Sequence, residues 1–204
     1  MRLDKKLNLV IPLERENETA YVHAMPVSFA TFELFSLIFA KTYSTLMSQG
    51  LGPIAGPSVA MVLLKETAEN TYRRINEKGE RESWLPGPDG VELGLLAEIR
   101  RLTNYLYLDN GSWTQVPLEA ALSRGILEEE EVFEVNNQLA FFTVVSHAPP
   151  RGDRETLVAG AASMFNGHTT LLNCTDYLNS LPTSKEDDTT QMKGTRSSIP
   201  SSIG

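Results

Sequence analysis

The chain has 204 residues, of which 41% are apolar and 22% are charged, and its formal net charge is −8. A chain of this length is expected to form one domain, or one domain with an appendage, and to fold without disulfides or a structural metal. One cysteine and three histidines exclude an internal disulfide and disfavour a zinc site. The acidic excess disfavours nucleic acid, which binds clustered Lys and Arg.

Neither secretion nor a membrane span is expected. The start of the chain lacks the basic and apolar regions of a signal peptide, and Glu33, Lys41 and Lys65 interrupt the most apolar segments. These segments are far shorter than the roughly 20 residues that cross a bilayer. The composition therefore favours a cytosolic protein.

Residues 1–27 are predicted to form a β-hairpin. Apolar residues alternate along residues 5–13, a polar turn follows at residues 15–18, and residues 19–25 form the returning strand. Pro12 cannot donate a ladder hydrogen bond, so the first strand should be an edge strand or end near Ile11.

The strongest helical pattern begins at Ser28, a candidate N-cap, and continues to about Gln49. Its apolar residues recur at spacings of three and four. Residues 50–58 are rich in glycine but lack the Gly-Lys-Ser/Thr ending of a P-loop, so they are interpreted as a connector. A second helix is expected from Ser58 to Arg74, with its first half buried.

Further helices are predicted after a polar loop at residues 76–90. An amphipathic helix should begin at Glu92 and end at Asp109-Asn110-Gly111. The other expected helices span residues 117–123, 128–147, 154–164 and 169–179. The predicted fold class is therefore mainly α: a helical bundle over residues 28–182, with the N-terminal hairpin and a flexible polar tail at residues 183–204.

No cluster of residues indicates chemistry. Glu128–Glu131 complements a helix dipole or faces a basic partner. His23, His147 and His168 do not converge with a nucleophile, and Cys174 lies among apolar neighbours. No catalytic, cofactor or metal site is predicted, and the protein is not expected to be an enzyme.

Aromatic residues occur on more than one face of the predicted helices, and two interpretations of them have equal weight. Either these helices are internal to one bundle, or their surplus faces bind another chain. The candidate partner-binding residues are Phe32, Phe35, Phe39, Tyr43, Phe141 and Phe142.

The layout resembles a family. It combines a hairpin at Leu7–Met25, a capped aromatic helix at Ser28–Gln49, acidic helical segments that include Pro117–Ala121 and Glu128–Ser146, and a Ser/Thr-rich end after Pro182. This pattern is similar to the tail assembly chaperones of long-tailed bacteriophages. The resemblance implies a non-catalytic helper in the host cytoplasm that needs no cofactor. Such a helper binds and solubilises the tape measure protein and promotes assembly of the tail tube protein.

Two other functions stay open. A small acidic phage protein is also compatible with an inhibitor of a host defence system that acts through an acidic protein-binding surface. The third candidate is a structural tail or neck subunit of the virion. The sequence leaves open whether the chain forms a homo-oligomer.

Overall fold

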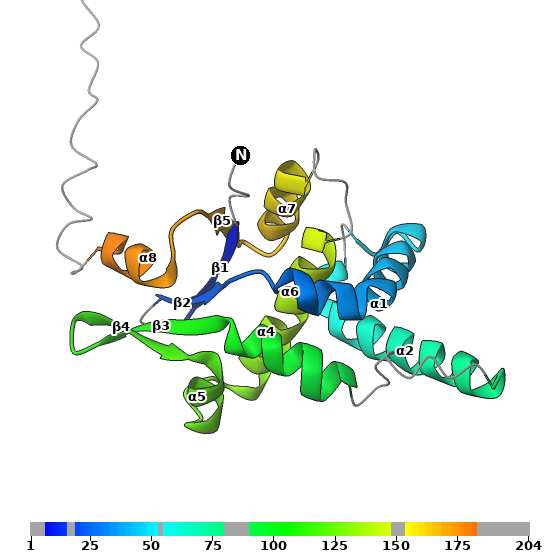
Figure 1. The fold of residues 1–204 in the computed structure, drawn as a ribbon. Coiled ribbons are helices and arrows are strands. Elements are labelled where there is room, and N and C mark those ends of the chain that lie inside the picture. The colour runs from blue at the N-terminus through cyan, green and yellow to red at the C-terminus, as the bar shows by residue number, and fades with distance from the viewer. Residues whose placement is uncertain (1–6, 16–18, 53–54, 80–89, 148–153, 183–204) are drawn as a thin grey trace, which may run out of the picture.

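The computed structural model describes residues 7–15, 19–52, 55–79, 90–147 and 154–182 (Figure 1). The strands are β1 (Asn8–Glu14), β2 (Thr19–Ala24), β3 (Thr103–Asp109), β4 (Ser112–Pro117) and β5 (His168–Thr170). The helices are α1 (Phe29–Ser48), α2 (Gly56–Glu77), the π-helix η1 (Val91–Leu96), α4 (Ala97–Arg101), α5 (Leu118–Ser123), α6 (Glu129–His147), α7 (Arg154–Ser163) and α8 (Cys174–Ser180). The predicted polar tail and most of the predicted loop at residues 76–90 lie outside the described residues.

The prediction of a mainly helical bundle is wrong, because these helices pack around a five-stranded antiparallel sheet and the fold is α/β. The strand order is β4-β3-β2-β1-β5. The predicted pairing of the first two strands is confirmed, with Leu9 opposite Ala24 and Glu14 opposite Thr19. A lone hairpin is marginal in water. Here β3 and β5 extend it on its two sides. Strand β3 lies in a segment that was predicted to be helical, and β5 overlaps the start of the helix predicted at residues 169–179.

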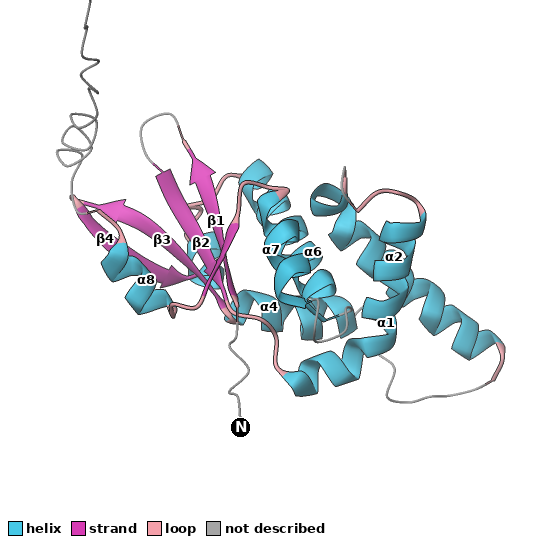
Figure 2. Cartoon of the chain, turned by 90° about the horizontal axis from the view of Figure 1, so that it is seen from above, coloured by secondary structure: helices cyan, strands magenta, loops and turns pink. Residues whose placement is uncertain are grey.

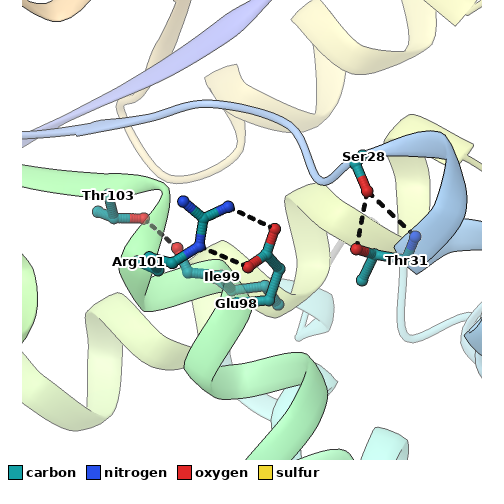
Figure 3. Close-up of polar contacts among 6 residues, drawn as sticks. All are labelled: Ser28, Thr31, Glu98, Ile99, Arg101 and Thr103. Carbon is teal, nitrogen blue, oxygen red and sulfur yellow. Dashed lines mark hydrogen bonds and ion pairs between the residues drawn. The ribbon is translucent and has the colours of Figure 1, made fainter.

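Strands β3 and β4 form a second hairpin, which overturns the prediction of a helix up to residue 109. Helix α4 already ends at Arg101, where the side chain bonds Glu98 at 2.7 and 2.8 Å (Figure 3). The turn that follows β3 contains Asn110 with φ 51° and Gly111 with φ 82°. Two consecutive positive φ values are typical of the type I′ turn of a two-residue hairpin. Asn110-Gly111 is therefore a hairpin turn and does not end a helix.

Pro12 lies where the sheet can accept a proline. Strand β5 pairs only with Asn8–Val10 of β1, so the remainder of β1 pairs with β2 alone. A residue without an N–H is tolerated on such an open edge. The predicted edge position is confirmed for this part of the strand, although the strand continues beyond Ile11 to Glu14.

The two faces of the sheet pack against different layers. Because side chains alternate along a strand, Leu9, Ile11 and Leu13 join the main core with the helices, whereas Val10 joins a smaller cluster with Leu106 and Tyr177 on the other face. Helix α8 contributes Tyr177 to this second cluster. Helices α1 and α2 lie at the end of the molecule far from β4 and α8 (Figures 1 and 2).

Helix α6 is the centre of the main core. Nearly all of its residues from Val135 to Ser146 are buried, and it packs against α2, α7, α1 and β1. Its N-terminus is held by Arg15 at the end of β1, whose guanidinium donates to both carboxylate oxygens of Glu131 at 2.8 and 2.7 Å and to the carbonyl of Ile126 at 2.9 Å. The sheet and the helical layer are therefore joined by apolar burial and by a bidentate ion pair.

A buried histidine joins the sheet to the segment before α8. The Nε2 of His23 lies 3.1 Å from the carbonyl oxygen of Leu172, which also accepts from the side-chain amide of Asn8 at 2.8 Å. Burial lowers the pKa of His23 from its ordinary value near 6.5. It also lowers the pKa of His168. Both rings pack on Tyr177 at centroid distances of 5.8 Å.

We expect Gly111→Ala to reduce the free energy of unfolding by roughly 1–2 kcal/mol, because φ 82° is a left-handed conformation that a Cβ disfavours. A Cβ at Gly111 would meet no atom within 4 Å, so the loss would come from the backbone alone. Gly160→Ala in α7 is the matched control, because a Cβ there also meets nothing, and it should stabilise the helix by roughly 0.5–1 kcal/mol. Urea unfolding measures both variants. Equal effects would contradict the type I′ turn.

We expect the free energy of unfolding to fall as the pH is lowered from about 7 to about 5. The folded pKa values of His23 and His168 lie below the unfolded value near 6.5, so the unfolded chain binds more protons as the pH falls through that value. The bidentate carboxylates of Glu98 and Glu131 also have lowered pKa values, but their contribution is lost only as the pH falls through 4.5, below this window. Thermal melts should show that His23→Gln makes the stability depend less on pH between about 7 and about 5. The variant His168→Asn measures the contribution of the second histidine to the same dependence. An unchanged slope in both variants would contradict this assignment.

Candidate protein-binding site

Helix α1 is defined by caps at both of its ends. The hydroxyl of Ser28 accepts from the backbone N–H of Thr31 at 3.1 Å (Figure 3), which satisfies one of the unpaired donors of the first turn. At the other end Gly50 has φ 66°, and the N–H of Leu51 donates to the carbonyl of Leu46 at 3.0 Å. The predicted boundaries of this helix are therefore close to the observed ones, and the caps fix where the helix begins and ends.

The inner face of α1 is core. Its buried residues are Phe35, Ile38, Phe39, Thr42 and Leu46. Phe35 packs close to the backbone of η1, where a Cβ on Gly94 would lie 3.3 Å from the ring. The predicted partner-binding residues Phe35 and Phe39 are therefore enclosed within a single subunit, and a partner cannot reach them unless the core opens.

The two half-buried candidates on α1 lie at the margin of the core. The ring of Phe32 stacks on His147 of α6, with centroids 5.0 Å apart and an interplanar angle of 19°, and on Phe39 at 6.0 Å. Tyr43 also packs against the main core. One side of each ring is therefore occupied, and contact of Phe32 and Tyr43 with a partner stays a prediction.

The two candidates on α6 are also buried. Phe141 and Phe142 are almost completely enclosed. Phe141 packs so closely against Gly56 at the start of α2 that a Cβ there would collide with the ring. It also contacts Phe165 edge to face at 6.5 Å. These rings join α6 to its neighbouring helices, and their burial removes them from the accessible surface.

The outer face of α1 is accessible and mostly apolar. Phe29 is 74% exposed, Leu34 46%, Leu37 39% and Met47 42%. Together with the other exposed residues of the helix they form what we call the outer α1 face: Phe29, Ala30, Glu33, Leu34, Leu37, Ala40, Ser44, Met47 and Ser48. At about 100° per residue these nine positions fall within an arc of about 140°. Within the described part of the chain, no layer covers this side of the helix.

Charge is sparse on this helix. Of its 20 residues only Glu33 and Lys41 are charged. Lys41 lies at the border of the outer α1 face, where its ammonium donates to the hydroxyl of Thr71 at 3.2 Å. It lines an open, hydroxyl-rich cavity of about 290 Å³ between α1 and α2. The outer α1 face is therefore bordered on one side by the polar groups that line this cavity.

A second cavity, of about 230 Å³, lies beside the open edge of β1 and is acidic. Its lining includes Glu14, Glu131, Glu134 and Gln138. Glu131 already binds Arg15, which holds the pKa of this carboxyl below its usual range, and it also accepts from the backbone N–H of Glu128 at 2.8 Å. This arrangement caps α6 and favours the helix-terminus interpretation of the acidic run over a metal site.

The histidines and the cysteine are not assembled into a site. Within the ranges that the structure describes, no three His, Cys, Asp or Glu side chains are grouped so that they could hold a metal ion. Cys174 is half-buried, and burial raises the pKa of its thiol to about 11. The thiol is therefore protonated at neutral pH, and the reactive thiolate is scarce.

No known protein guides the interpretation of the site, which therefore depends on its geometry. Searches with this chain found no match among protein-family models, curated proteins or solved structures. In the described part of the chain, none of the helices has the length and apolar content needed to cross a membrane. The outer α1 face is consequently the candidate site.

Sequence reasoning chose contact residues on α1 and α6, of which Phe35 and Phe39 lie on the inner side of α1 and Phe141 and Phe142 are buried in α6. Leu34 and Met47 belong to the apolar pattern of the predicted helix, yet the aromatic rings were chosen as the contact residues. The exposed side of α1, with its nine exposed positions, can be recognised only when the packing of α2 and α6 against the helix is known. The small residues Ala30, Ala40 and Ser44 lie on this exposed face, and the distance to which two helices approach depends on the side chains at their contact.

We expect Phe39→Ala to reduce the free energy of unfolding by about 3–5 kcal/mol, because it removes a fully buried ring and leaves a cavity. Leu37→Ala, two residues away on the outer α1 face, should change it by less than about 0.5 kcal/mol. Chemical denaturation of the two variants tests which side of α1 is core. A small effect of Phe39→Ala would show that the inner face is not packed as described.

Proposed function

We propose that this chain is a non-catalytic assembly chaperone that binds an amphipathic helix of its client through the outer α1 face. The observation that carries the proposal is a 20-residue helix with two charged residues, one side of which is apolar and exposed. Isolated exposed apolar residues are ordinary, but a contiguous apolar face marks an interaction site. Recognition of an amphipathic helix by apolar contacts at spacings of three and four is a common mode of peptide binding.

The identity of the client is proposed from the resemblance to phage tail assembly chaperones. The client is then the tape measure protein of the same phage, and the complex forms in the host cytoplasm and promotes assembly of the tail tube protein. A long helical client exposes apolar stripes before assembly. Its chaperone must cover them while keeping the complex in solution, and a net charge of −8 supports this second requirement.

The binding residues proposed now differ from those predicted from the sequence. Leu34 and Leu37 are central, because they are the exposed leucines of the helix, and Phe29 and Met47 extend the contact toward its ends. Phe32 and Tyr43 are placed at the margin. Phe35, Phe39, Phe141 and Phe142 support the face from beneath and are not proposed as contacts.

We expect Leu37→Glu to abolish solubilisation of the tape measure protein, because client binding would then bury a carboxylate in an apolar contact. The affinity should fall by at least roughly tenfold. The measurement is the soluble fraction of the tape measure protein when both proteins are expressed together. The matched control is Leu157→Glu on α7, whose leucine is exposed to a similar degree but lies on another helix.

Equal loss of solubilisation in both variants, or no loss in either, would contradict the proposed binding face. Thermal melts of the free variants should first show that both are folded.

A chaperone should be absent from purified virions, whereas a structural tail or neck subunit would be found there by mass spectrometry.

One observation favours the second candidate function, inhibition of a host defence system. The start of α6 presents exposed Glu128, Glu129, Glu130 and Glu134 beside the acidic cavity. A basic partner attracted to this region would bind less tightly as the salt concentration rises, because exposed charges are screened within about 10 Å at 0.1 M. Binding through the outer α1 face should persist, so a salt titration of the isolated complex distinguishes the two functions.

A further inference from the structure

We infer that, in the absence of a client, the outer α1 face binds the same face of a second copy of this chain, with the two α1 helices antiparallel and a two-fold axis at Leu37. Two-fold dimers are the commonest homo-oligomers, and their interfaces must be self-complementary. Both the charges and the side-chain sizes along α1 have this property.

The charges of α1 select the antiparallel arrangement. Glu33 and Lys41 are four residues before and four residues after Leu37. In an antiparallel pair centred on Leu37, Glu33 of one copy therefore faces Lys41 of the other, and the two-fold axis forms this pair twice. A parallel pair in register would place Glu33 opposite Glu33 and Lys41 opposite Lys41, and like charges that face each other are destabilising.

These two groups are available for the contact. Glu33 is exposed, and no ion pair of its carboxylate is found within the described ranges. Lys41 is half-buried, and its ammonium donates to the hydroxyl of Thr71. An ammonium carries three donors, so Lys41 retains donors for a carboxylate across the axis.

Side-chain sizes match in the same register. Equal steps from Leu37 place Leu34 opposite Ala40 and Ala30 opposite Ser44. The Leu34–Ala40 pair thus sets a large side chain against a small one, and the Ala30–Ser44 pair sets two small ones together. Small side chains on both sides of the Leu37 axis let two helices approach to the usual 8–10 Å. No shift in register is needed to satisfy both the charges and the sizes.

The contact between the two α1 helices is small, so the dimer should be weak. A helix of 20 residues is about 30 Å long, and one pair of such helices covers less than the roughly 1,600 Å² of a standard stable interface. The dimer should therefore be weak and exchange readily. A client helix that occupies the same face must compete with it; this competition rests on the proposed function, whereas the dimer itself does not.

The test is a charge-reversal cycle on the full chain, measured by sedimentation equilibrium from about 1 μM to about 1 mM, the range in which weak association is visible. Glu33→Lys and Lys41→Glu should each weaken dimerisation by roughly tenfold, because each places like charges opposite one another twice. The double variant Glu33→Lys with Lys41→Glu restores opposite charges and should return the dimer to the wild-type affinity.

Oxidative cross-linking tests the register without relying on affinity. In a Cys174→Ser background, Leu37→Cys places two thiols at the axis and should form a disulfide-linked dimer. Ser44→Cys on the same face is the matched control, since its two copies are offset by roughly 20 Å along the helices and should not cross-link. Circular dichroism of every variant checks that the chain is folded.

A monomeric wild-type chain, a dimer that ignores both charge reversals, or a double variant that stays monomeric would each overturn the antiparallel dimer. Cross-linking of Ser44→Cys but not of Leu37→Cys would do the same. Client binding is measured separately by co-expression. Failure to solubilise the tape measure protein while the charge-reversal pattern holds would overturn the proposed function and leave the dimer intact.

Discussion

The structure depends on the burial of helix α6. Almost every residue of its second half is enclosed, so it needs partners on all sides, and the sheet, α1, α2 and α7 supply them. A buried asparagine fixes one of these contacts: Asn137 accepts from the backbone N–H of Met61 in α2 at 3.1 Å and donates to the carbonyl of Phe133 at 2.9 Å. A satisfied polar group in an apolar core specifies the register of its neighbours, because any slip would leave it unpaired.

This arrangement explains why α1 is apolar on both sides. Its inner rings are required to cover α6, and Phe32 and Phe39 do so by stacking toward His147 at 5.0 and 6.0 Å. Nothing in the described chain covers the other side of α1, yet Leu34, Leu37 and Met47 are found there. The inner rings thus have a structural reason to be apolar, whereas the described residues of the subunit give the outer residues none.

Local signals predicted the long helices α1, α2 and α6 and the first hairpin, because caps, prolines and apolar periodicity act within a few residues. The second hairpin was missed, since the apolar residues Leu95, Leu96, Ile99, Leu102 and Leu106 continue a helical spacing across the boundary between α4 and β3. Strand β5 has three residues and exists because β1 offers it an edge, which no local pattern reveals. The burial of Phe35 and Phe39 could not be read from the sequence for a similar reason: which face of α1 is covered depends on α2 and α6, far along the chain.

The negative charge of the chain opposes the association of two copies, whereas the apolar outer α1 face favours it. The distances over which the repulsion and the attraction act decide whether two copies associate. Two copies that each carry a charge of −8 repel one another over distances comparable to the Debye length, about 8 Å at physiological salt. The apolar contact and the pairs of Glu33 with Lys41 act at close approach, where screening is weaker. Salt therefore removes more of the long-range repulsion than of the attraction. Acidity opposes aggregation of the free copies, while a face with matched charges still permits one specific contact at a time, which is the behaviour that the proposed chaperone function requires.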